Sequence, residues 1–344
     1  MKFNEIAGTG LKIPAVIFGT SALGNLYTAI SDQTKTDILK QAFEHCPVPV
    51  VFDSAGKYGA GLALEKLGEC LDKLNLDPDK VIISNKLGWR RTALRTAEPT
   101  FEPGVWKNLQ FDAVQDISYE GIMRCFEEGN RLCGSKYPAQ LASVHDPDEY
   151  LNAAVSSKDR DTRFTNIVEG YRALSDLRKN GKIKAIGIGA KNWRIIEEIA
   201  AEVDLGWVML ANSMTILRHP QELLTFMEKL QTQKISIINS AVFHAGFLTG
   251  GNYFDYKMVN NSENKTLFSW REAFFALCKK HNITPAQACV SFAMSAPGVI
   301  SIAMNTSKPA SIKVNVQLVN TKIPAEFWWN MKQKGLISEE YKHI

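Results

Sequence analysis

Four side chains in the first half of the chain have the types and the spacing needed for proton chemistry. Asp53, Lys86 and His145 each close a short apolar run, and Tyr58 follows Asp53 within the segment Ser54-Ala55-Gly56-Lys57-Tyr58-Gly59. A tyrosine hydroxyl has a reference pKa of about 10, too high for ready proton exchange at neutral pH. A nearby ammonium group lowers that pKa because it favours the phenolate.

The other two residues complete this arrangement. Asp53 can balance the charge of Lys86 in a dry pocket, and a neutral His145 can orient a substrate oxygen by hydrogen bonding. Each residue also has an ordinary alternative: a cap for Asp53, packing for Tyr58, solvent exposure for Lys86 and a structural hydrogen bond for His145. The sequence pairs no nucleophile with its own base and shows no metal-ligand spacing, so we predict no metal site. Taken together, the set predicts proton transfer at an alcohol or carbonyl, with a nicotinamide cofactor if hydride transfer is the other half.

The elements that must position these residues alternate between strand-like and helix-like segments. Predicted strands cover residues 15–18, 50–53, 81–86, 141–145, 183–188, 207–210, 235–238 and 299–303. Predicted helices cover about 31–45, 61–74, 118–132, 163–180, 193–203, a segment after Pro220, 268–281, 285–295, 308–319 and a last one opened by Pro324. An unbroken series of this kind favours the α/β class and a closed (β/α)8 TIM barrel, with residues 1–344 as a single domain. The carboxyl ends of the barrel strands share one face, which places Asp53, Lys86 and His145 there, with Tyr58 in a loop on the same face.

Three segments depart from the alternation. Residues 3–13 predict an N-terminal β-hairpin that turns at Gly8-Thr9-Gly10. Residues 88–117 form a long loop after the third strand, without a clean period, and we predict that it is a functional lid or wall. A glycine-bearing loop at 244–262 precedes the helix predicted at 268–281.

Composition excludes several classes of protein. The net charge of +4 is too small and too dispersed to indicate nucleic-acid binding. No run of 18 apolar residues indicates a membrane span, and the N-terminus has no signal- or transit-peptide pattern. The six cysteines form neither a CxxC pair nor a zinc-like cluster, which predicts reduced structural thiols in a cytoplasmic protein.

Short motifs around the four residues suggest a family. They are Phe52-Asp53-Ser54-Ala55 with Tyr58-Gly59, Ile83-Ser84-Asn85-Lys86, and His145. In order and spacing they resemble the catalytic tetrad of the aldo-keto reductase superfamily, a (β/α)8 barrel that binds NAD(P) in an extended form at the carboxyl-terminal face. The resemblance implies that Tyr58 is the general acid/base, that Lys86 lowers its pKa, that Asp53 pairs with Lys86 and that His145 orients the substrate.

Further motifs resemble one branch of this superfamily. They are Thr9-Gly10-Leu11, the segment 19–27, Asp116-Ile117-Ser118, His145-Asp146-Pro147-Asp148 and the segment 181–189. The branch contains the L-fucose, D-threo-aldose and L-galactose dehydrogenases, and related members oxidise pyridoxal. Tyr27, Trp89 and Trp106 are candidates for a wall facing a sugar, although apolar packing is an equally good interpretation of each.

The resemblance also implies a set of cofactor contacts. They are Gly19, Thr20, Asp53, Asn212, Ser240, Asn305, Thr306, Ser311 and Asn315. Ser240 stands where the family often has an aromatic residue, and Ala211 where it usually has Gln, which leaves Asn212 as a substitute. Asn305 and Ser311 stand where NADP-dependent relatives place Lys and Arg, so a 2′-phosphate would lose charge-assisted hydrogen bonds of about 1.5–3 kcal/mol each. The sequence therefore favours NAD over NADP, unless Lys308 or Lys313 compensates.

The predicted function is an NAD(P)-dependent oxidoreductase, an aldose 1-dehydrogenase. It would oxidise the anomeric hydroxyl of an aldose such as L-fucose, D-arabinose or L-galactose to the lactone by hydride transfer to NAD. Three alternatives stay open at this point: an NADPH-dependent aldehyde or ketone reductase, a non-turnover cofactor-sensing subunit, and an unrelated barrel enzyme that uses Lys86 as a Schiff base. The expected partners are a small sugar or aldehyde, without nucleic acid or membrane, and the expected assembly is a monomer or a small homo-oligomer.

Overall fold

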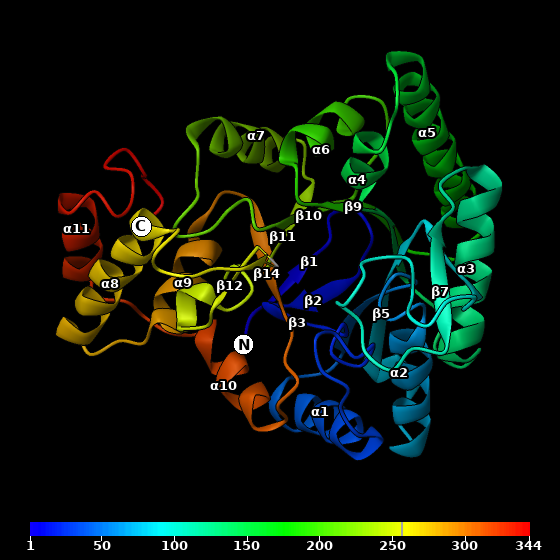
Figure 1. The fold of residues 1–344 in the computed structure, drawn as a ribbon, viewed down its shortest axis with the longest axis horizontal. Helices are drawn as coiled ribbons and strands as arrows, with labels where there is room; N and C mark the ends of the chain where they lie inside the picture. The colour runs from blue at the N-terminus through cyan, green and yellow to red at the C-terminus, as the bar shows by residue number, and fades with distance from the viewer. Residues whose placement is uncertain (256) are drawn as a thin grey trace.

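Eight parallel strands close into a barrel in the computed structural model, which describes residues 1–255 and 257–344. Their order around the barrel is β10-β11-β14-β3-β4-β5-β8-β9 (Figure 1). The strands are β3 (Val16–Gly19), β4 (Val50–Ala55), β5 (Val81–Leu87), β8 (Leu141–His145), β9 (Ala185–Ala190), β10 (Trp207–Ala211), β11 (Ser236–Ser240) and β14 (Val299–Met304). The predicted (β/α)8 barrel is therefore confirmed, with most strand boundaries within two residues of the prediction.

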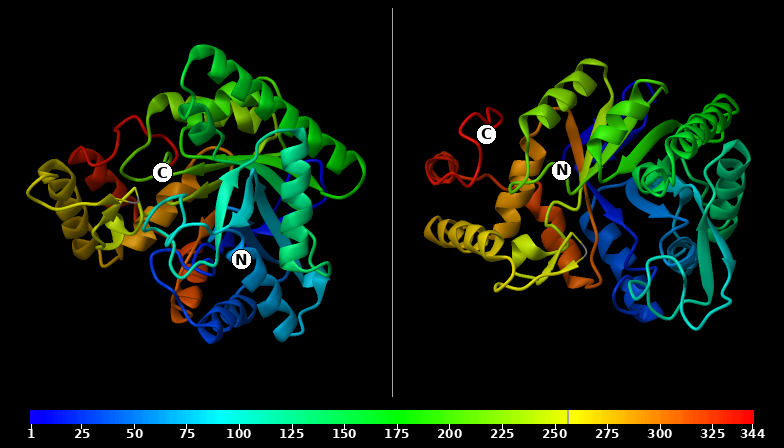
Figure 2. Two further views of the ribbon diagram at one scale, coloured as in Figure 1. Left: turned by 45° about the vertical axis from the view of Figure 1, so that its right-hand side comes forward. Right: turned by 45° about the horizontal axis from the view of Figure 1, so that its top comes forward.

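Helices wrap the barrel on its outside, and α8 and α11 pack against each other at one edge (Figures 1 and 2). The helices are α1 (Asp32–His45), α2 (Leu62–Lys73), α3 (Tyr119–Cys133), α4 (Pro147–Asn152), α5 (Ser157–Lys179), α6 (Trp193–Ala200), α7 (Gln221–Thr232), α8 (Lys265–Lys280), α9 (Pro285–Ser295), α10 (Ala310–Leu318) and α11 (Ala325–Gln333). Ser31 and Ser118 accept backbone hydrogen bonds at the starts of α1 and α3, as N-cap residues do. No helix in the described part of the chain combines the length and the apolar character needed to cross a membrane.

The N-terminal hairpin closes the end of the barrel at which the strands begin. Strands β1 (Phe3–Glu5) and β2 (Lys12–Pro14) pair antiparallel, as predicted. Ile6 and Ile13 are fully buried and belong to the same apolar cluster as barrel-interior residues that include Val51, Ile82, Leu141, Trp207 and Ile238. Since this end is plugged by apolar side chains, the opposite end, where the strands finish, is the one left for a ligand.

Alternation along the strands brings polar residues to that open end. Side chains of a strand point in turn to the barrel interior and to the helices, so positions two apart share a face. From the plugged end upward, the interior positions are Val51 and Asp53 on β4, Ile82, Ser84 and Lys86 on β5, and Leu141, Ser143 and His145 on β8. On each of these strands an apolar residue of the plugged end is therefore followed, nearer the open end, by a residue of the predicted tetrad.

The segment 88–117 contains regular structure, so the prediction that it is irregular was wrong. Strands β6 (Trp89–Ala93) and β7 (Phe111–Gln115) form an antiparallel pair. Eight of their ten residues are partly buried or exposed, which weakens the period-two pattern. A long connection at 94–110 replaces the short turn that marks a hairpin in sequence.

Other local elements also escaped the sequence analysis. Helix α5 starts at Ser157, six residues before its predicted start at 163, because Ser156 accepts a hydrogen bond from the backbone N–H of Asp159. The short helix α4 follows β8 directly and carries Pro147 in its first turn. The predicted loop at 244–262 contains the 3-10 turn η2 (Phe247–Thr249) and the two-residue strands β12 (Tyr253–Phe254) and β13 (Lys257–Met258). Residue 256 of that loop lies outside the described residues.

Candidate active site

Three adjacent strands, β4, β5 and β8, carry Asp53, Lys86 and His145 to the open end of the barrel. The Lys86 ammonium group forms a buried ion pair with the carboxylate of Asp53, and both side chains are 3% exposed. The second carboxylate oxygen of Asp53 accepts a hydrogen bond of 3.0 Å from the Ser84 hydroxyl. Because removal of one partner from a buried ion pair leaves an uncompensated charge, this contact holds both side chains in place.

Tyr58 lies over this ion pair in the turn that follows β4. The Lys86 Nζ atom lies 4.8 Å from the centroid of the Tyr58 ring. The His145 ring meets the Tyr58 ring edge-on, with 5.5 Å between centroids. A Cβ on Gly59 would come within 2.4 Å of the Gly24 carbonyl oxygen, so glycine is required where the loop after β3 crosses the Tyr58 turn. The structure thus brings the phenol, the amine, the carboxylate and the imidazole into one place.

The acidity of Tyr58 differs from the sequence-based expectation. We expected Lys86 to lower the pKa of the phenol, whereas burial raises it well above its usual value and the charges of Asp53 and Asp146 raise it further. The physical reason is that burial disfavours the charged phenolate, and the carboxylate of Asp53, which lies beside the Lys86 ammonium group, repels it. In this structure Tyr58 is therefore a protonated phenol at neutral pH.

His145 is neutral, as the sequence analysis expected. Burial lowers its pKa to about 3, and the ammonium groups of Lys86, Lys57 and Lys191 act in the same direction against the opposing charge of Asp146. The Nδ1 atom is buried and has no hydrogen-bond partner among the described residues. A neutral imidazole at this position can donate or accept a hydrogen bond at a substrate oxygen without adding charge.

An aromatic wall rises beside Tyr58 from the connection between β6 and β7. Phe101 and Trp106 belong to a small apolar cluster that also contacts Tyr58 and Trp89. The Trp106 ring lies 5.9 Å from the Tyr58 ring, and the Trp89 ring lies 5.9 Å from that of Phe101. Tyr27 stacks on Tyr253 of β12, with 5.3 Å between ring centroids. Of the predicted wall residues, Trp106 packs against the tetrad tyrosine, whereas Trp89 packs against Phe101.

Four of the remaining strands carry predicted cofactor contacts in an arc beside the tetrad. Asn212, Ser240, Asn305 and Gly19 stand at the ends of β10, β11, β14 and β3, which are consecutive around the barrel. The backbone N–H of Thr20 donates to the Asp53 carbonyl oxygen at 3.0 Å, which joins the arc to the tetrad. Four neighbouring strand ends can therefore hold one elongated ligand.

The residues of this arc fit a nicotinamide cofactor. Asn212 is buried, and its Oδ1 atom has no hydrogen-bond partner among the described residues, so it can accept from a carboxamide N–H. Thr306, Ser311 and Asn315, the other predicted contacts, lie partly exposed in and before α10. Asn305 is exposed, and its side chain accepts a hydrogen bond of 3.3 Å from the Ala22 backbone N–H. Lys308 and Lys313, the candidates for compensating charge, are exposed at the same helix.

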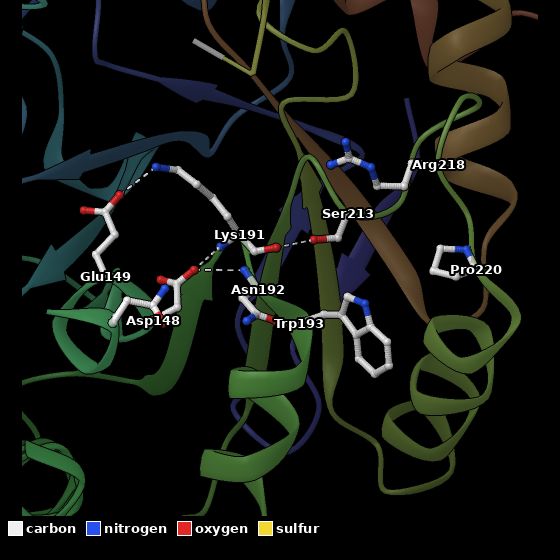
Figure 3. A pocket seen from close by; sticks show the side chains of 9 residues that line it. Asp148, Glu149, Lys191, Asn192, Trp193, Ser213, Arg218 and Pro220 are labelled. Carbon is white, nitrogen blue, oxygen red and sulfur yellow. Dashed lines mark hydrogen bonds and ion pairs between the residues drawn. The ribbon is translucent and has the colours of Figure 1, made fainter. Parts of the chain in front are cut away.

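A hollow of about 460 Å³ opens beside the tetrad, at the ends of β8, β9 and β10 (Figure 3). Its lining is Asp148, Glu149, Asn152, Lys191, Asn192, Trp193, Ser213, Arg218 and Pro220. In Figure 3 the Lys191 side chain reaches across to Glu149, and Arg218 approaches from the other side. The tetrad residues do not line this hollow, but Glu149 in its lining contacts Lys57, the residue that precedes Tyr58.

Sequence analysis missed an ion cluster next to the tetrad. Lys57, with a side chain 2% exposed, contacts Asp146 at 2.8 Å, Glu149 at 2.7 Å and Glu102 at 3.0 Å. These carboxylates outweigh the effect of burial and raise the pKa of Lys57 above its usual value. Lysine in an otherwise small and apolar turn was an available signal, but its partners lie too far along the chain to be identified from sequence.

The titratable residues do not assemble a recognisable metal centre. Within residues 1–255 and 257–344, no group of three or more His, Cys, Asp or Glu side chains has the geometry to hold a metal ion. The nearby carboxylates instead contact lysine ammonium groups.

The fold and the site together define a barrel oxidoreductase with a proton-transfer centre, and comparison with known proteins places it in a family. Residues 15–335 match the model of the Aldo/keto reductase family. The chain belongs to this family and is an NAD(P)-dependent oxidoreductase.

Relatives of known activity cover almost the whole chain. Pyridoxal 4-dehydrogenase of Microbacterium luteolum is 30% identical, over 97% of this chain and 98% of its own length. D-threo-aldose 1-dehydrogenase of a Pseudomonas species is 27% identical, over 96% and 97%. L-galactose dehydrogenase of Arabidopsis thaliana is 21% identical, over 93% and 88%. The resemblance to the aldose dehydrogenase branch is confirmed at this level.

Solved structures share the fold. A glycerol dehydrogenase from Gluconobacter oxydans superposes with a TM-score of 0.69 at 17% identity, covering 99% of this chain and 98% of its own. A thermostable aldo-keto reductase, solved in complex with the inhibitor epalrestat, superposes with a TM-score of 0.64 at 15% identity, covering 97% and 99%. At these identities the likeness supports the barrel architecture alone.

Proposed function

We propose that the protein oxidises the hemiacetal hydroxyl of a small cyclic sugar to a lactone, with NAD as the electron acceptor. The observation that carries the proposal is the buried Lys86–Asp53 pair beneath the Tyr58 ring, with the neutral His145 at its edge. Aldoses such as L-fucose, D-arabinose and L-galactose present this hydroxyl at C1. Pyridoxal, named by one relative, also closes to a cyclic hemiacetal, so the same chemistry covers both relatives' substrates.

In this reaction the chain's own residues manage the proton. When bound, the nicotinamide accepts the hydrogen and the electron pair that leave C1. Tyr58 receives the hydroxyl proton, for which it must first be a phenolate, and His145 holds the hydroxyl oxygen by a hydrogen bond. Lys86 and Asp53 form a neutral pair under the ring and fix its position. In the reverse direction the protonated phenol donates to a carbonyl oxygen. Reduction of an aldehyde is therefore the second candidate function, because the raised pKa of Tyr58 keeps the phenol protonated.

The preference for NAD rests on the residues that would surround a 2′-phosphate. Asn305 and Ser311 supply no positive charge there, and Lys308 is the nearest candidate before α10. An uncompensated phosphate forfeits about 1.5–3 kcal/mol for each missing charge-assisted hydrogen bond. We therefore propose that NAD binds more tightly than NADP. Cytoplasmic location and the monomeric or small homo-oligomeric state stay predictions.

Tyr58→Phe tests the proton-transfer role. Loss of the hydroxyl should lower kcat by at least about a hundredfold, the usual contribution of a positioned acid or base. NAD affinity, measured by quenching of protein fluorescence, should stay within about threefold, because the phenyl ring and its packing are kept. Turnover would be followed at the absorbance of reduced nicotinamide with a panel of free aldoses, pyridoxal and simple aldehydes.

Three outcomes would contradict the proposal. Wild-type kcat in a folded Tyr58→Phe protein would remove Tyr58 from its role. Absence of turnover with every substrate in the panel, combined with tight retention of NAD, would instead support the cofactor-sensing alternative. Trapping of a sugar on Lys86 by borohydride would support Schiff-base chemistry.

A further inference from the structure

Lys57 is a buried charge that the proton-transfer reaction does not require. It immediately precedes Tyr58, its side chain is 2% exposed, and its ammonium group contacts three carboxylates. Its Nζ atom also lies 4.9 Å from the centroid of the Trp89 ring. Burial of an ammonium group costs several kcal/mol unless partners compensate it, so the position of Lys57 determines the positions of those partners.

The first partner, Glu102, belongs to the aromatic wall. One of its carboxylate oxygens contacts Lys57 at 3.0 Å, and the other accepts a hydrogen bond of 2.7 Å from the indole N–H of Trp106. The Trp106 ring in turn packs on Tyr58. Lys57 is therefore linked to the wall through two consecutive polar contacts and determines how closely Trp106 approaches the phenol.

The second partner, Asp146, lies next to His145. Its Oδ2 atom contacts Lys57 at 2.8 Å and stands 3.6 Å from the Nε2 atom of His145. Asp146 adopts a left-handed backbone conformation with a φ of 49°, which a side-chain contact must hold against its conformational cost. Lys57 thus anchors the end of β8 on the side of the imidazole.

The third partner, Glu149, reaches the hollow shown in Figure 3. Its Oε2 atom contacts Lys57 at 2.7 Å, and its Oε1 atom contacts Lys191 at 2.7 Å. Three carboxylates face the two ammonium groups of Lys57 and Lys191, and the Arg218 guanidinium that also lines the hollow is paired with Asp255 at 3.2 Å. This leaves an excess of negative charge, and Glu102 and Glu149 keep about a third of their side chains exposed. Such a rim offers acceptors to hydroxyl groups and repels anions.

We propose that Lys57 is a positioning residue that sets the space between Trp106 and His145. Through its carboxylate partners it also selects uncharged polyhydroxylated substrates over phosphorylated or carboxylated ones. This inference rests on the proposed function, because it names the substrate class that the same site accepts. Lys57 acts through Glu102 and Asp146 and needs no contact with the substrate.

Variants of one carboxylate partner and variants of Lys57 itself separate the contributions of these residues to turnover. Glu102→Gln should raise KM for a free aldose about fivefold with little change in kcat, because the polar link between Lys57 and Trp106 is weakened. Lys57→Met should lower kcat/KM about a hundredfold, because Tyr58, Trp106 and His145 lose their common anchor. Lys57→Arg should recover most of this loss. Glu198→Gln, which breaks the 2.7 Å ion pair with Arg160 between α5 and α6, is the matched control and should change neither constant.

The preference between substrates and the rigidity of the aromatic wall provide readouts beyond turnover of one substrate. The wild type should prefer a free aldose over its phosphate ester, and Glu102→Gln and Glu149→Gln should each narrow that preference. Trypsin should cut Lys57→Met and Glu102→Gln faster after Arg95 or Lys107 than the wild type, and the tryptophan emission should shift to the red. Trypsin cleavage and tryptophan emission need no substrate, so they distinguish failure of the positioning role from failure of the proposed function.

The proposal is overturned if folded Lys57→Met keeps the wild-type KM, kcat and protease resistance, or if Lys57→Arg fails to recover activity while retaining NAD affinity. Equal activity of the wild type toward a free aldose and its phosphate ester would overturn the proposed preference for uncharged substrates. If Lys57→Met does not fold, Glu102→Gln and Glu149→Gln decide the question, because each leaves Lys57 with two carboxylates.

Discussion

At the scale of single residues, the pocket determines the charge state of each group that can move a proton. His145 is kept neutral by burial, which lowers its pKa to about 3. Tyr58 is kept protonated because burial and two nearby carboxylates raise its pKa. The Lys86–Asp53 pair is neutral as a unit. A phenol of this kind is populated in its protonated form, from which it can donate a proton, and it accepts a proton only after ionisation, so the two directions of the reaction should respond differently to pH.

The oxidative rate should therefore rise with pH. Since the pKa of Tyr58 is raised, the phenolate fraction increases as pH increases, and kcat/KM with saturating NAD should gain about tenfold per pH unit between pH 7 and 9. No inflection should occur near pH 6.5, because His145 is already neutral there. A pH profile of initial rates tests this, and Tyr58→Phe should flatten it. A rate that falls across this range would contradict the assignment of Tyr58.

At the scale of elements, the N-terminal hairpin decides which end of the barrel is open. Ile6 and Ile13 are fully buried against the interior residues of the barrel, so the hairpin supplies the lower layer of that core. The β6–β7 pair plays the opposite role, since the connection between its strands brings Trp106 over Tyr58 at the open end. Two hairpins at opposite ends thus give the barrel one plug and one wall.

Ile13→Ala should destabilise the protein without altering the site. Removal of a fully buried isoleucine side chain leaves a cavity and should lower the free energy of unfolding by about 2–5 kcal/mol. Lys12→Ala, on the same strand with an exposed side chain, is the control and should change it by less than about 0.5 kcal/mol. Denaturant titration measures both values. A large loss of NAD affinity in folded Ile13→Ala would show that the hairpin does more than close the barrel.

At the scale of the whole molecule, the site divides the barrel into two arcs. Strands β4, β5 and β8 hold the tetrad, and β10, β11, β14 and β3 hold the proposed cofactor contacts. The second arc joins the two ends of the chain, because β14 pairs with β3. A ligand that lies along this arc therefore contacts segments that are distant in sequence and that separate on unfolding.

NAD should consequently stabilise the folded chain. At a concentration of about a hundred times its Kd, it should add about 2.7 kcal/mol to the free energy of unfolding by mass action. NADP at the same concentration should add less, because Asn305 and Ser311 provide no charge for a 2′-phosphate. Denaturant titration with each cofactor measures the difference, and Tyr58→Phe should retain the NAD effect. Equal stabilisation by both cofactors would contradict the preference for NAD.

The sequence by itself determined the barrel and the placement of three tetrad residues, because both follow from local regularities. Alternation along β4, β5 and β8 and the shared direction of parallel strands place Asp53, Lys86 and His145 on one face, whatever the loops do. Only the tertiary structure decided the pairing of β6 with β7, the contact of Trp106 with Tyr58 and the three partners of Lys57. Those contacts join Lys57 to Glu102, Asp146 and Glu149 across long stretches of chain. The same is true of the raised pKa of Tyr58, since burial and the spacing of charges depend on how distant segments pack and carry no periodic signal in the sequence.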